Sequence, residues 1–227
     1  MQARDYPLYH LLLAQIQRQR KENDAALASL QAAMDRSSKM QLSQSDKATA
    51  YLELFHVLMA KDKKDDAGEL IRDALAEMRG SPQEGSLLLA HADYLLDNNE
   101  LDVALEQLKL VPHSHTHYMK AHEKMADIYL NRLKDEQLYL NCYREIARQE
   151  PTLDNLSLLG DAYLALHQVE AAIAAYEEAL KIEPRHSQLA SKIGRALILT
   201  HQYTKALNYY KDALKESSNH VCNLFLF

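Results

Sequence analysis

The sequence predicts an all-α protein built from successive helical hairpins. Small residues recur every 34 positions, at Ala92, Ala126, Gly160 and Gly194, and each is followed three positions later by leucine or tyrosine. A fixed period of this length is typical of arrays in which one helix–turn–helix unit stacks on the next. The chain also has only 5 Gly and 5 Pro among 227 residues, too few for many strands joined by tight turns.

One hairpin shows the pattern most clearly, over residues 153–184. Its small, apolar and helix-ending positions are Leu156, Leu159, Gly160, Tyr163, Ala172, Tyr176, Ala179 and Pro184. Leu156, Leu159 and Tyr163 fall on one face of a first helix. Gly160 and Ala172 are small where two antiparallel helices must approach closely, and Pro184 stops the second helix. This order resembles the tetratricopeptide repeat. The next hairpin repeats it with Gly194, Ala206 and Tyr210.

Six hairpins are expected, forming one right-handed superhelical solenoid over residues 1–227. Their approximate bounds are 7–40, 48–81, 85–118, 119–152, 153–186 and 187–220. Ala14, Ala26 and Ala33 mark the first hairpin. In the second, Phe55 stands where a small residue is expected, so this pair should pack less tightly. Residues 221–227 read as a truncated, uncapped tail, which is typical of a piece of a longer solenoid.

The connectors between hairpins agree with these bounds. Ser43 and the residues after it can cap a helix that begins near Lys47. The tripeptide 80–82 (Gly-Ser-Pro) separates the second and third hairpins. Pro112 ends the third hairpin and Pro151 the fourth. The fourth lacks one residue, because Pro151 to Pro184 is 33 positions whereas the period is 34, and we place this deletion in the turn at 132–135.

Composition limits the classes of function. The net charge of -6 provides no basic surface for nucleic acid. Two cysteines, Cys142 and Cys222, do not form a disulfide framework, which favours a reducing compartment. The start of the chain does not resemble a signal peptide, and no apolar run reaches the length of a membrane span. A soluble, cytoplasmic protein without direct membrane insertion is expected.

No motif predicts catalysis or cofactor binding. A Gly-rich phosphate loop, a nucleophile elbow and an HExxH helix are all missing from the sequence. We therefore expect a non-enzymatic protein with no cofactor, no catalytic residue and no small-molecule substrate. His113, His115 and His117 alternate in one connector. A zinc site is one interpretation of them, but zinc sites combine defined ligands at defined spacing, so a solvated loop is favoured and no metal is predicted.

A periodic pattern suggests where a protein partner would bind. In tetratricopeptide proteins the ninth position of each first helix tends to face the inner groove. Here it is occupied by Asp93, Asp127, Asp161 and Arg195, and three positions after the aspartates come Leu96, Leu130 and Leu164. We expect a groove that accepts a segment with basic and apolar side chains. Alternatively, the aspartates are ordinary polar residues in the middle of helices.

Two stretches carry a more specific resemblance. They are AHEKMADIYLNRLKDEQLYLNCYREIARQ at 121–149 and LASKIGRALILTHQYTKALNYYKDALK at 189–215, with residues 157–180 between them. Both are similar to the tetratricopeptide repeat protein 21 family, and the likeness extends over roughly residues 68–222. Members of that family are much longer subunits of intraflagellar transport complex A.

The resemblance implies a non-catalytic scaffold that binds other complex A subunits. It would act in retrograde ciliary transport and cargo delivery, at the cilium or flagellum and its base. Two other interpretations stay open: a cytosolic adaptor or co-chaperone unrelated to cilia, and the substrate-binding repeat array of a larger enzyme.

Overall fold

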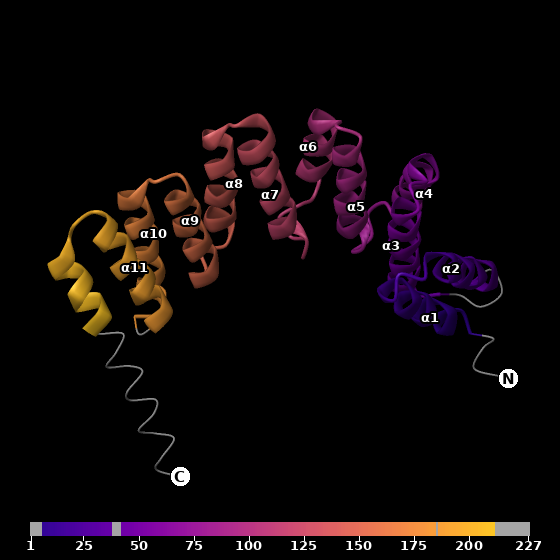
Figure 1. Ribbon diagram of the computed structural model, residues 1–227, viewed down its shortest axis with the longest axis horizontal. Coiled ribbons are helices and arrows are strands. Elements are labelled where there is room, and N and C mark those ends of the chain that lie inside the picture. Colours follow the sequence, from indigo (N-terminus) through magenta and orange to yellow (C-terminus); the bar gives the residue numbers. More distant parts are fainter. Residues whose placement is uncertain (1–5, 38–41, 185, 212–227) are drawn as a thin grey trace, which may run out of the picture. The chain divides into compact units, whose positions relative to one another are not determined.

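The computed structural model describes residues 6–37, 42–184 and 186–211, and this part of the chain is all-α (Figure 1). The helices in chain order are α1 (Pro7–Gln19), α2 (Asn23–Ser37), α3 (Gln44–Ala60), α4 (Lys64–Glu77), α5 (Glu84–Asp97), α6 (Leu101–Lys109), α7 (Tyr118–Asp127), the π-helix η2 (Ile128–Leu133), α8 (Glu136–Gln149), α9 (Leu153–Ala165), α10 (Val169–Ile182) and α11 (Ser187–Leu199). A further helix covers residues 203–211. The predicted tetratricopeptide-type all-α fold class is confirmed.

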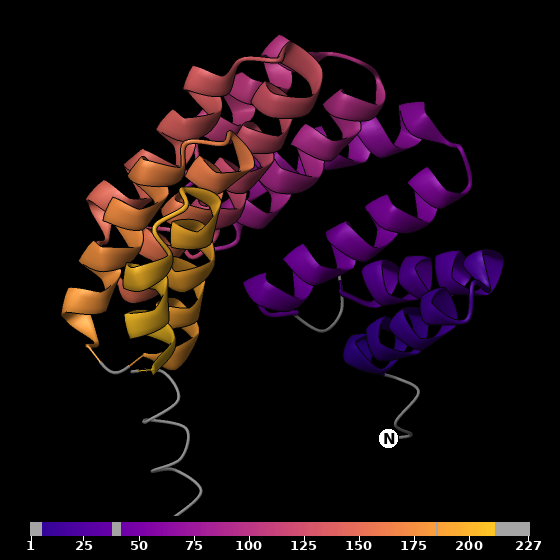
Figure 2. The ribbon, with the colours of Figure 1, turned by 60° about the vertical axis from the view of Figure 1, so that its left-hand side comes forward.

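Consecutive helices form antiparallel pairs that lie side by side (Figures 1 and 2). The pairs are α1 with α2, α3 with α4, α5 with α6, α7 and η2 with α8, α9 with α10, and α11 with helix 203–211. The chain divides into two compact units, with unit 1 ending at Ala121 and unit 2 beginning at His122. A single solenoid over residues 1–227 therefore stays a prediction. Residues 212–227, with the tail and Cys222, lie outside the described part.

The turn inside each pair is closed by one residue with left-handed backbone. These residues are Lys21, Asp62, Asn99, Lys134, His167 and His201, with φ between 57° and 64°. In the α9–α10 turn, His167 donates its N–H to the Leu164 carbonyl, and Gln168 donates to the Tyr163 carbonyl at 2.9 Å. Two such bonds satisfy the last carbonyls of the first helix. Because each pair has one such residue at the same place in its turn, positions in the six pairs can be compared by counting from it.

Five residues after the left-handed residue, the second helix carries a small buried side chain. In five pairs this residue is an alanine, at most 2% exposed: Ala26, Ala67, Ala104, Ala172 and Ala206. A side chain this small lets the backbones of the paired helices come close together. Within each unit, neighbouring pairs also share core clusters. For example, Ala26 and Leu30 of α2 share one cluster with Ala50 and Val57 of α3.

In unit 2, a tyrosine ring lies over the glycine of the first helix. A Cβ atom built on Gly160 would overlap the ring of Tyr176, and one built on Gly194 would crowd the ring of Tyr210. Tyr176 is fully buried, together with Leu156, Ala172 and Ala179 of the same core cluster. Leu159, Tyr163 and Tyr210 pack against this cluster and are partly buried. Pro184 is exposed, two residues after α10 ends.

The fourth pair differs from the others in its first helix. In the α9–α10 pair, the left-handed residue His167 comes seven positions after the small residue Gly160. In the fourth pair, Lys134 comes eight positions after Ala126. The π-helix η2 takes up the extra residue, because its turns are wider than those of an α-helix. The closing bond also spans one residue more, from the N–H of Asp135 to the carbonyl of Tyr129. The predicted deletion at 132–135 is therefore wrong, since this turn holds an insertion.

The missing residue lies after the fourth pair instead. Three residues separate α8 from α9, at 150–152, whereas four separate α10 from α11, at 183–186. In the second helix, Tyr139 occupies the position of the usual alanine and is buried, with its ring 5.2 Å from that of Tyr143. The insertion in η2 thus coincides with a much larger side chain in α8.

Two further details concern the N-terminal unit. Helix α3 begins at Gln44, earlier than the predicted Lys47, and Ser43 caps it by accepting a hydrogen bond from the Asp46 N–H at 3.1 Å. Phe55 is buried in the core that α3 shares with α4 and α5. Among the described helices, none is long and apolar enough to cross a lipid bilayer.

The packing at Gly160 predicts that Gly160→Leu destabilises unit 2. Because the Tyr176 ring occupies the space of the new side chain, overpacking should lower the free energy of unfolding by about 1–3 kcal/mol. Urea denaturation followed by circular dichroism measures this. The matched control is Ala165→Leu, which adds bulk at an exposed position of the same helix. Equal stability of the two variants would contradict the packing described.

Candidate protein-binding surface

Charged side chains link the first helices of neighbouring pairs. In unit 1, Arg18 of α1 donates from Nε to Glu53 Oε2 of α3 at 2.5 Å and from Nη2 to Oε1 at 3.2 Å. In unit 2, Lys192 of α11 reaches Asp161 of α9. Asp161 is one of the predicted groove residues, and Arg18 occupies in α1 the position that Leu164 occupies in α9. The first consequence of the two ion pairs is structural, because each fixes one repeat against the next.

Among the predicted groove residues, Asp161 is held by three hydrogen bonds. Its Oδ1 accepts hydrogen bonds from the Tyr176 hydroxyl at 2.6 Å and from Lys192 Nζ at 2.9 Å. Its Oδ2 accepts a second bond from Lys192 at 2.7 Å. Since each carboxylate oxygen accepts about two hydrogen bonds, little capacity remains for a ligand. Lys192 also donates to Ser157 and lies 5.6 Å from the centroid of the Tyr176 ring.

The hydroxyl of Tyr176 depends on this carboxylate. Burial, together with the hydrogen bond to Asp161, raises the pKa of Tyr176 well above its ordinary value of 10.0. The hydroxyl therefore stays protonated and acts as a donor. A buried donor without an acceptor costs free energy, so Asp161 stabilises α10 as well as α11.

The other charged residues of the predicted groove are in different surroundings. Asp127, the last residue of α7, is exposed and accepts a bond from Asn131 Nδ2 at 2.6 Å. Arg195 of α11 is exposed. Asp93 of α5 is half-buried, and its negative charge acts on His56 of the preceding first helix.

The leucines of the predicted groove are half-buried. Leu164 packs against the core cluster of unit 2, so part of its surface serves the fold. Leu130 belongs to η2 in the same unit, while Leu96 belongs to α5 in unit 1. The predicted row of aspartates and leucines crosses from unit 1 to unit 2. As a continuous groove it stays a prediction.

The alternating histidines lie between α6 and α7. The ring of His115 covers Gly85 of α5, and its Nδ1 is 3.4 Å from Nδ1 of His117. His113 is exposed. Within residues 6–37, 42–184 and 186–211, no group of three or more His, Cys, Asp or Glu side chains is arranged to hold a metal ion.

Sequence reasoning missed the basic partners of this surface. Arg18 and Glu53 are 35 positions apart, and Asp161 and Lys192 are 31 apart, so each pair is separated by about one repeat. A search for opposite charges at this separation would have found both pairs. The groove was predicted from the aspartates alone, and the basic side chains of neighbouring repeats that pair with them were left out.

These features define the chain as a tetratricopeptide-type repeat protein. Three family models match it: tetratricopeptide repeat protein 21 ARM repeat over residues 1–146, tetratricopeptide repeat over 154–186, and the fourth ARM domain of tetratricopeptide repeat protein 21 over 189–226. The first alone covers more than half of the chain. The chain belongs to the tetratricopeptide repeat protein 21 family.

Similar sequences are far longer than this chain. Tetratricopeptide repeat protein 21B of Mus musculus is 39% identical over 204 residues, which are 85% of this chain and 16% of that protein. Tetratricopeptide repeat protein 21A of Homo sapiens is 34% identical over 203 residues, 85% of this chain and 15% of that protein. The chain thus spans about a sixth of the length of the curated relatives it matches.

Solved structures share the fold at low sequence identity. The C-terminal part of a TPR repeat-containing protein from Cytophaga hutchinsonii has a TM-score of 0.57 at 14% identity, covering 92% of this chain and 80% of that one. A chain of the APC/C hetero-tetramer Cut9–Hcn1 has a TM-score of 0.53 at 14% identity, covering 96% and 41%. At this identity, the two structures show a shared fold.

Substitution of Asp161 separates its two roles. Asp161→Ala leaves the buried Tyr176 hydroxyl without its acceptor and should lower the free energy of unfolding by about 1–3 kcal/mol. Asp161→Asn keeps an acceptor oxygen and removes only the half-exposed ion pair with Lys192, which should cost less than about 1 kcal/mol. Urea denaturation of both variants, with exposed Glu178→Ala as the control, measures the difference. Equal losses for Asp161→Ala and Asp161→Asn would contradict the role of the hydroxyl bond.

Acid should destabilise unit 1. Burial is the main cause that lowers the pKa values of His56, His91 and His117 from their ordinary 6.5 in the folded chain. Below pH 6.5 the unfolded chain then binds more protons than the folded chain, so stability falls as the pH drops from 7.5 to about 5.5. Urea midpoints across this range measure the loss. His56→Gln should reduce the pH dependence, and a dependence equal to that of the unaltered chain would contradict the assignment.

Proposed function

We propose that this chain is a non-catalytic scaffold of intraflagellar transport complex A, acting in retrograde ciliary transport and in cargo delivery to cilia. It would work in the cytoplasm, at the cilium or flagellum and its base. The observation that carries this proposal is the match to the tetratricopeptide repeat protein 21 family over 85% of the chain. Its partners would be the other subunits of that complex, bound as folded proteins or as extended segments.

The surface of the first helices supports such a role. Asp161 is neutralised by Lys192 and is used inside unit 2, so we assign partner contacts to charges that remain on the exterior. Asp127 and Arg195 are exposed side chains of this kind on α7 and α11. Opposite charges on one surface favour a partner with a matching pattern, because complementarity gives specificity and orientation.

Affinity purification of the tagged chain from ciliated cells tests this function. We expect the other complex A subunits to co-purify and to be identified by mass spectrometry. A double variant, Asp127→Lys with Arg195→Glu, reverses two exposed charges and should lower their recovery roughly tenfold, which corresponds to about 1.4 kcal/mol. The control is Glu178→Lys on an exposed face of α10.

The results have distinct meanings. Recovery of complex A subunits by the control but not by the double variant supports both the function and the surface. Recovery by both chains would preserve the function and overturn the assignment of the surface. Recovery of chaperones alone from every chain would overturn the proposed function.

A further inference from the structure

Two lysines of the chain stand in the same four-residue pattern. Residues 133–136 read Leu-Lys-Asp-Glu, and residues 180–183 read Leu-Lys-Ile-Glu. A large apolar residue directly before a lysine, with an acidic residue two positions after it, is the pattern that the conjugating enzyme of small ubiquitin-like modifiers binds. A pattern this short recurs by chance, so the structural surroundings of each lysine decide whether an enzyme can reach it.

This kind of recognition places three requirements on the segment. The apolar side chain packs on the enzyme, the lysine amine reaches the enzyme's cysteine, and the carboxylate pairs with a basic side chain of the enzyme. All three side chains must therefore be exposed and free of partners within their own chain. The backbone between them must also be able to adapt to the enzyme, which costs less in a turn than in a helix packed on a core.

The pattern at 133–136 meets these requirements. Leu133, the last residue of η2, is 43% exposed, although it is a large apolar side chain. Lys134 is the left-handed residue of the turn, and Glu136 is the first residue of α8; both are exposed. Among the described residues, none forms a hydrogen bond or an ion pair with the side chain of Lys134 or Glu136.

The remaining residue of this pattern is held by the fold. Asp135 caps α8, because its Oδ1 accepts a hydrogen bond from the Leu138 N–H at 2.9 Å. Its N–H donates to the carbonyl of Tyr129, also at 2.9 Å. The one position of the pattern that the enzyme does not read is thus the one that serves the turn.

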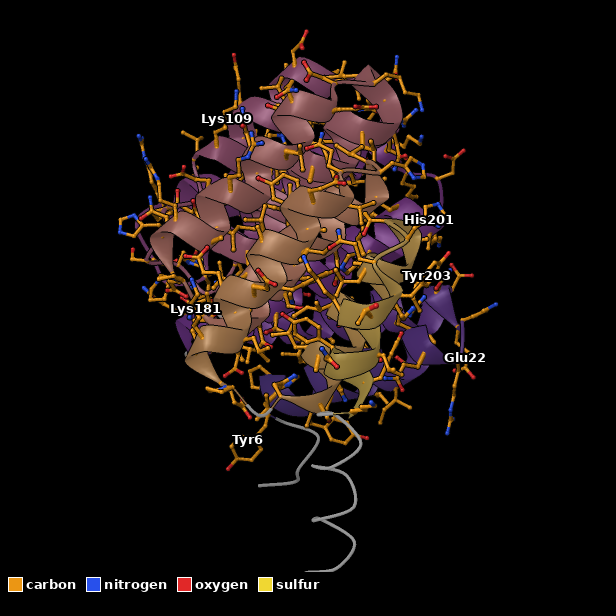
Figure 3. The ribbon with its side chains drawn as sticks, turned by 90° about the vertical axis from the view of Figure 1, so that its left-hand side faces the viewer. Tyr6, Glu22, Lys109, Lys181, His201 and Tyr203 are labelled. Carbon is orange, nitrogen blue, oxygen red and sulfur yellow. The ribbon has the colours of Figure 1, made fainter. Side chains whose placement is uncertain are left out.

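The pattern at 180–183 does not meet the requirements. Leu180 belongs to α10, is half-buried and packs against the core cluster of unit 2. Lys181 is exposed but lies within the same helix (Figure 3). An enzyme could bind Leu180 only if the end of α10 unwound and left the core. The fold therefore presents one of the two patterns and withholds the other.

We propose that Lys134 is an acceptor site for a small ubiquitin-like modifier. The neutral Nζ amine attacks the thioester that joins the C-terminal glycine of the modifier to the cysteine of the conjugating enzyme. An isopeptide N–C bond forms, the C–S bond breaks, and one proton of the amine passes to the sulfur, which leaves as a free thiol. An activating enzyme makes the thioester beforehand, with ATP as the co-reactant. The proposal does not depend on the ciliary role.

The fourth pair can carry this modification without unfolding. The bonds that hold its turn come from the backbone and from Asp135, and neither involves the lysine amine. The turn lies at one tip of the pair (Figure 1), and Lys134 is exposed there. The modifier would therefore add a new binding surface at this tip and leave the core of unit 2 as it is.

Conjugation with purified components tests the proposal. The full chain is incubated with the activating enzyme, a limiting amount of the conjugating enzyme, the modifier and ATP, and the conjugates are separated by gel electrophoresis. We expect one main conjugate, in which mass spectrometry finds Lys134 modified. Lys134→Arg keeps the positive charge but cannot form the isopeptide bond, so it should abolish this conjugate. Lys181→Arg is the matched control and should leave the initial rate unchanged.

Substitutions beside the lysine separate recognition of the pattern from simple access to an amine. Leu133→Ala and Glu136→Gln each remove one side chain that the enzyme binds, and each should lower the initial rate about tenfold. Glu183→Gln removes the corresponding carboxylate of the other pattern and should have no effect. All three residues are exposed, so circular dichroism of each variant should match the unaltered chain.

Three results would overturn the proposal. The unaltered chain could form no conjugate although a standard substrate is modified in the same mixture. Lys134→Arg could be modified as fast as the unaltered chain, which would place the modification on another lysine. Leu133→Ala and Glu136→Gln could both retain the full rate, which would show that the pattern is not recognised. None of these results bears on binding to complex A subunits, so the proposed function is tested separately.

Discussion

The close approach of two antiparallel helices is the constraint on which each hairpin depends. A left-handed turn residue ends the first helix, and a small side chain five residues later lies buried where the second helix begins, as in Ala104 and Ala172. One hairpin cannot bury all of its apolar surface, so its core is completed by the next hairpin. The cluster of Ala26, Leu30 and Val57 shows this directly, because its members come from two pairs. Within each unit, the stability of one pair therefore depends on its neighbour.

The fold class was predictable because its signal is periodic and repeated. Small residues 34 positions apart and apolar residues on one helical face identify the hairpins without any long-range information. The π-helix was not predictable from spacing. The extra residue in η2 is cancelled by the connector before α9, which is one residue shorter, so the distance from Ala126 to Gly160 stays at 34 positions. The available signal was Tyr139, a large side chain where the register of the other pairs requires alanine.

The candidate surface was predictable only in part. The register placed Asp161 near the middle of a first helix, which is where it lies in α9. Its partner was not predictable in the same way, since the direction of the Lys192 side chain depends on how α11 packs on α9 and α10. Periodicity reports which positions are equivalent, whereas ion pairs between repeats depend on residues that differ from one repeat to the next. This is why Asp127 and Asp161, at equivalent positions, have different surroundings.

The bulge in η2 makes the fourth hairpin less interchangeable than its neighbours. The extra residue in η2 and the short connector at 150–152 cancel in length, so together with the large Tyr139 side chain they form one structural block. Recombination or exon exchange that moved only one of these parts would place a tyrosine where alanine fits, or shift the next hairpin by one residue. A chimeric array must therefore transfer residues 128–152 together, just as it must transfer Gly160 with Tyr176.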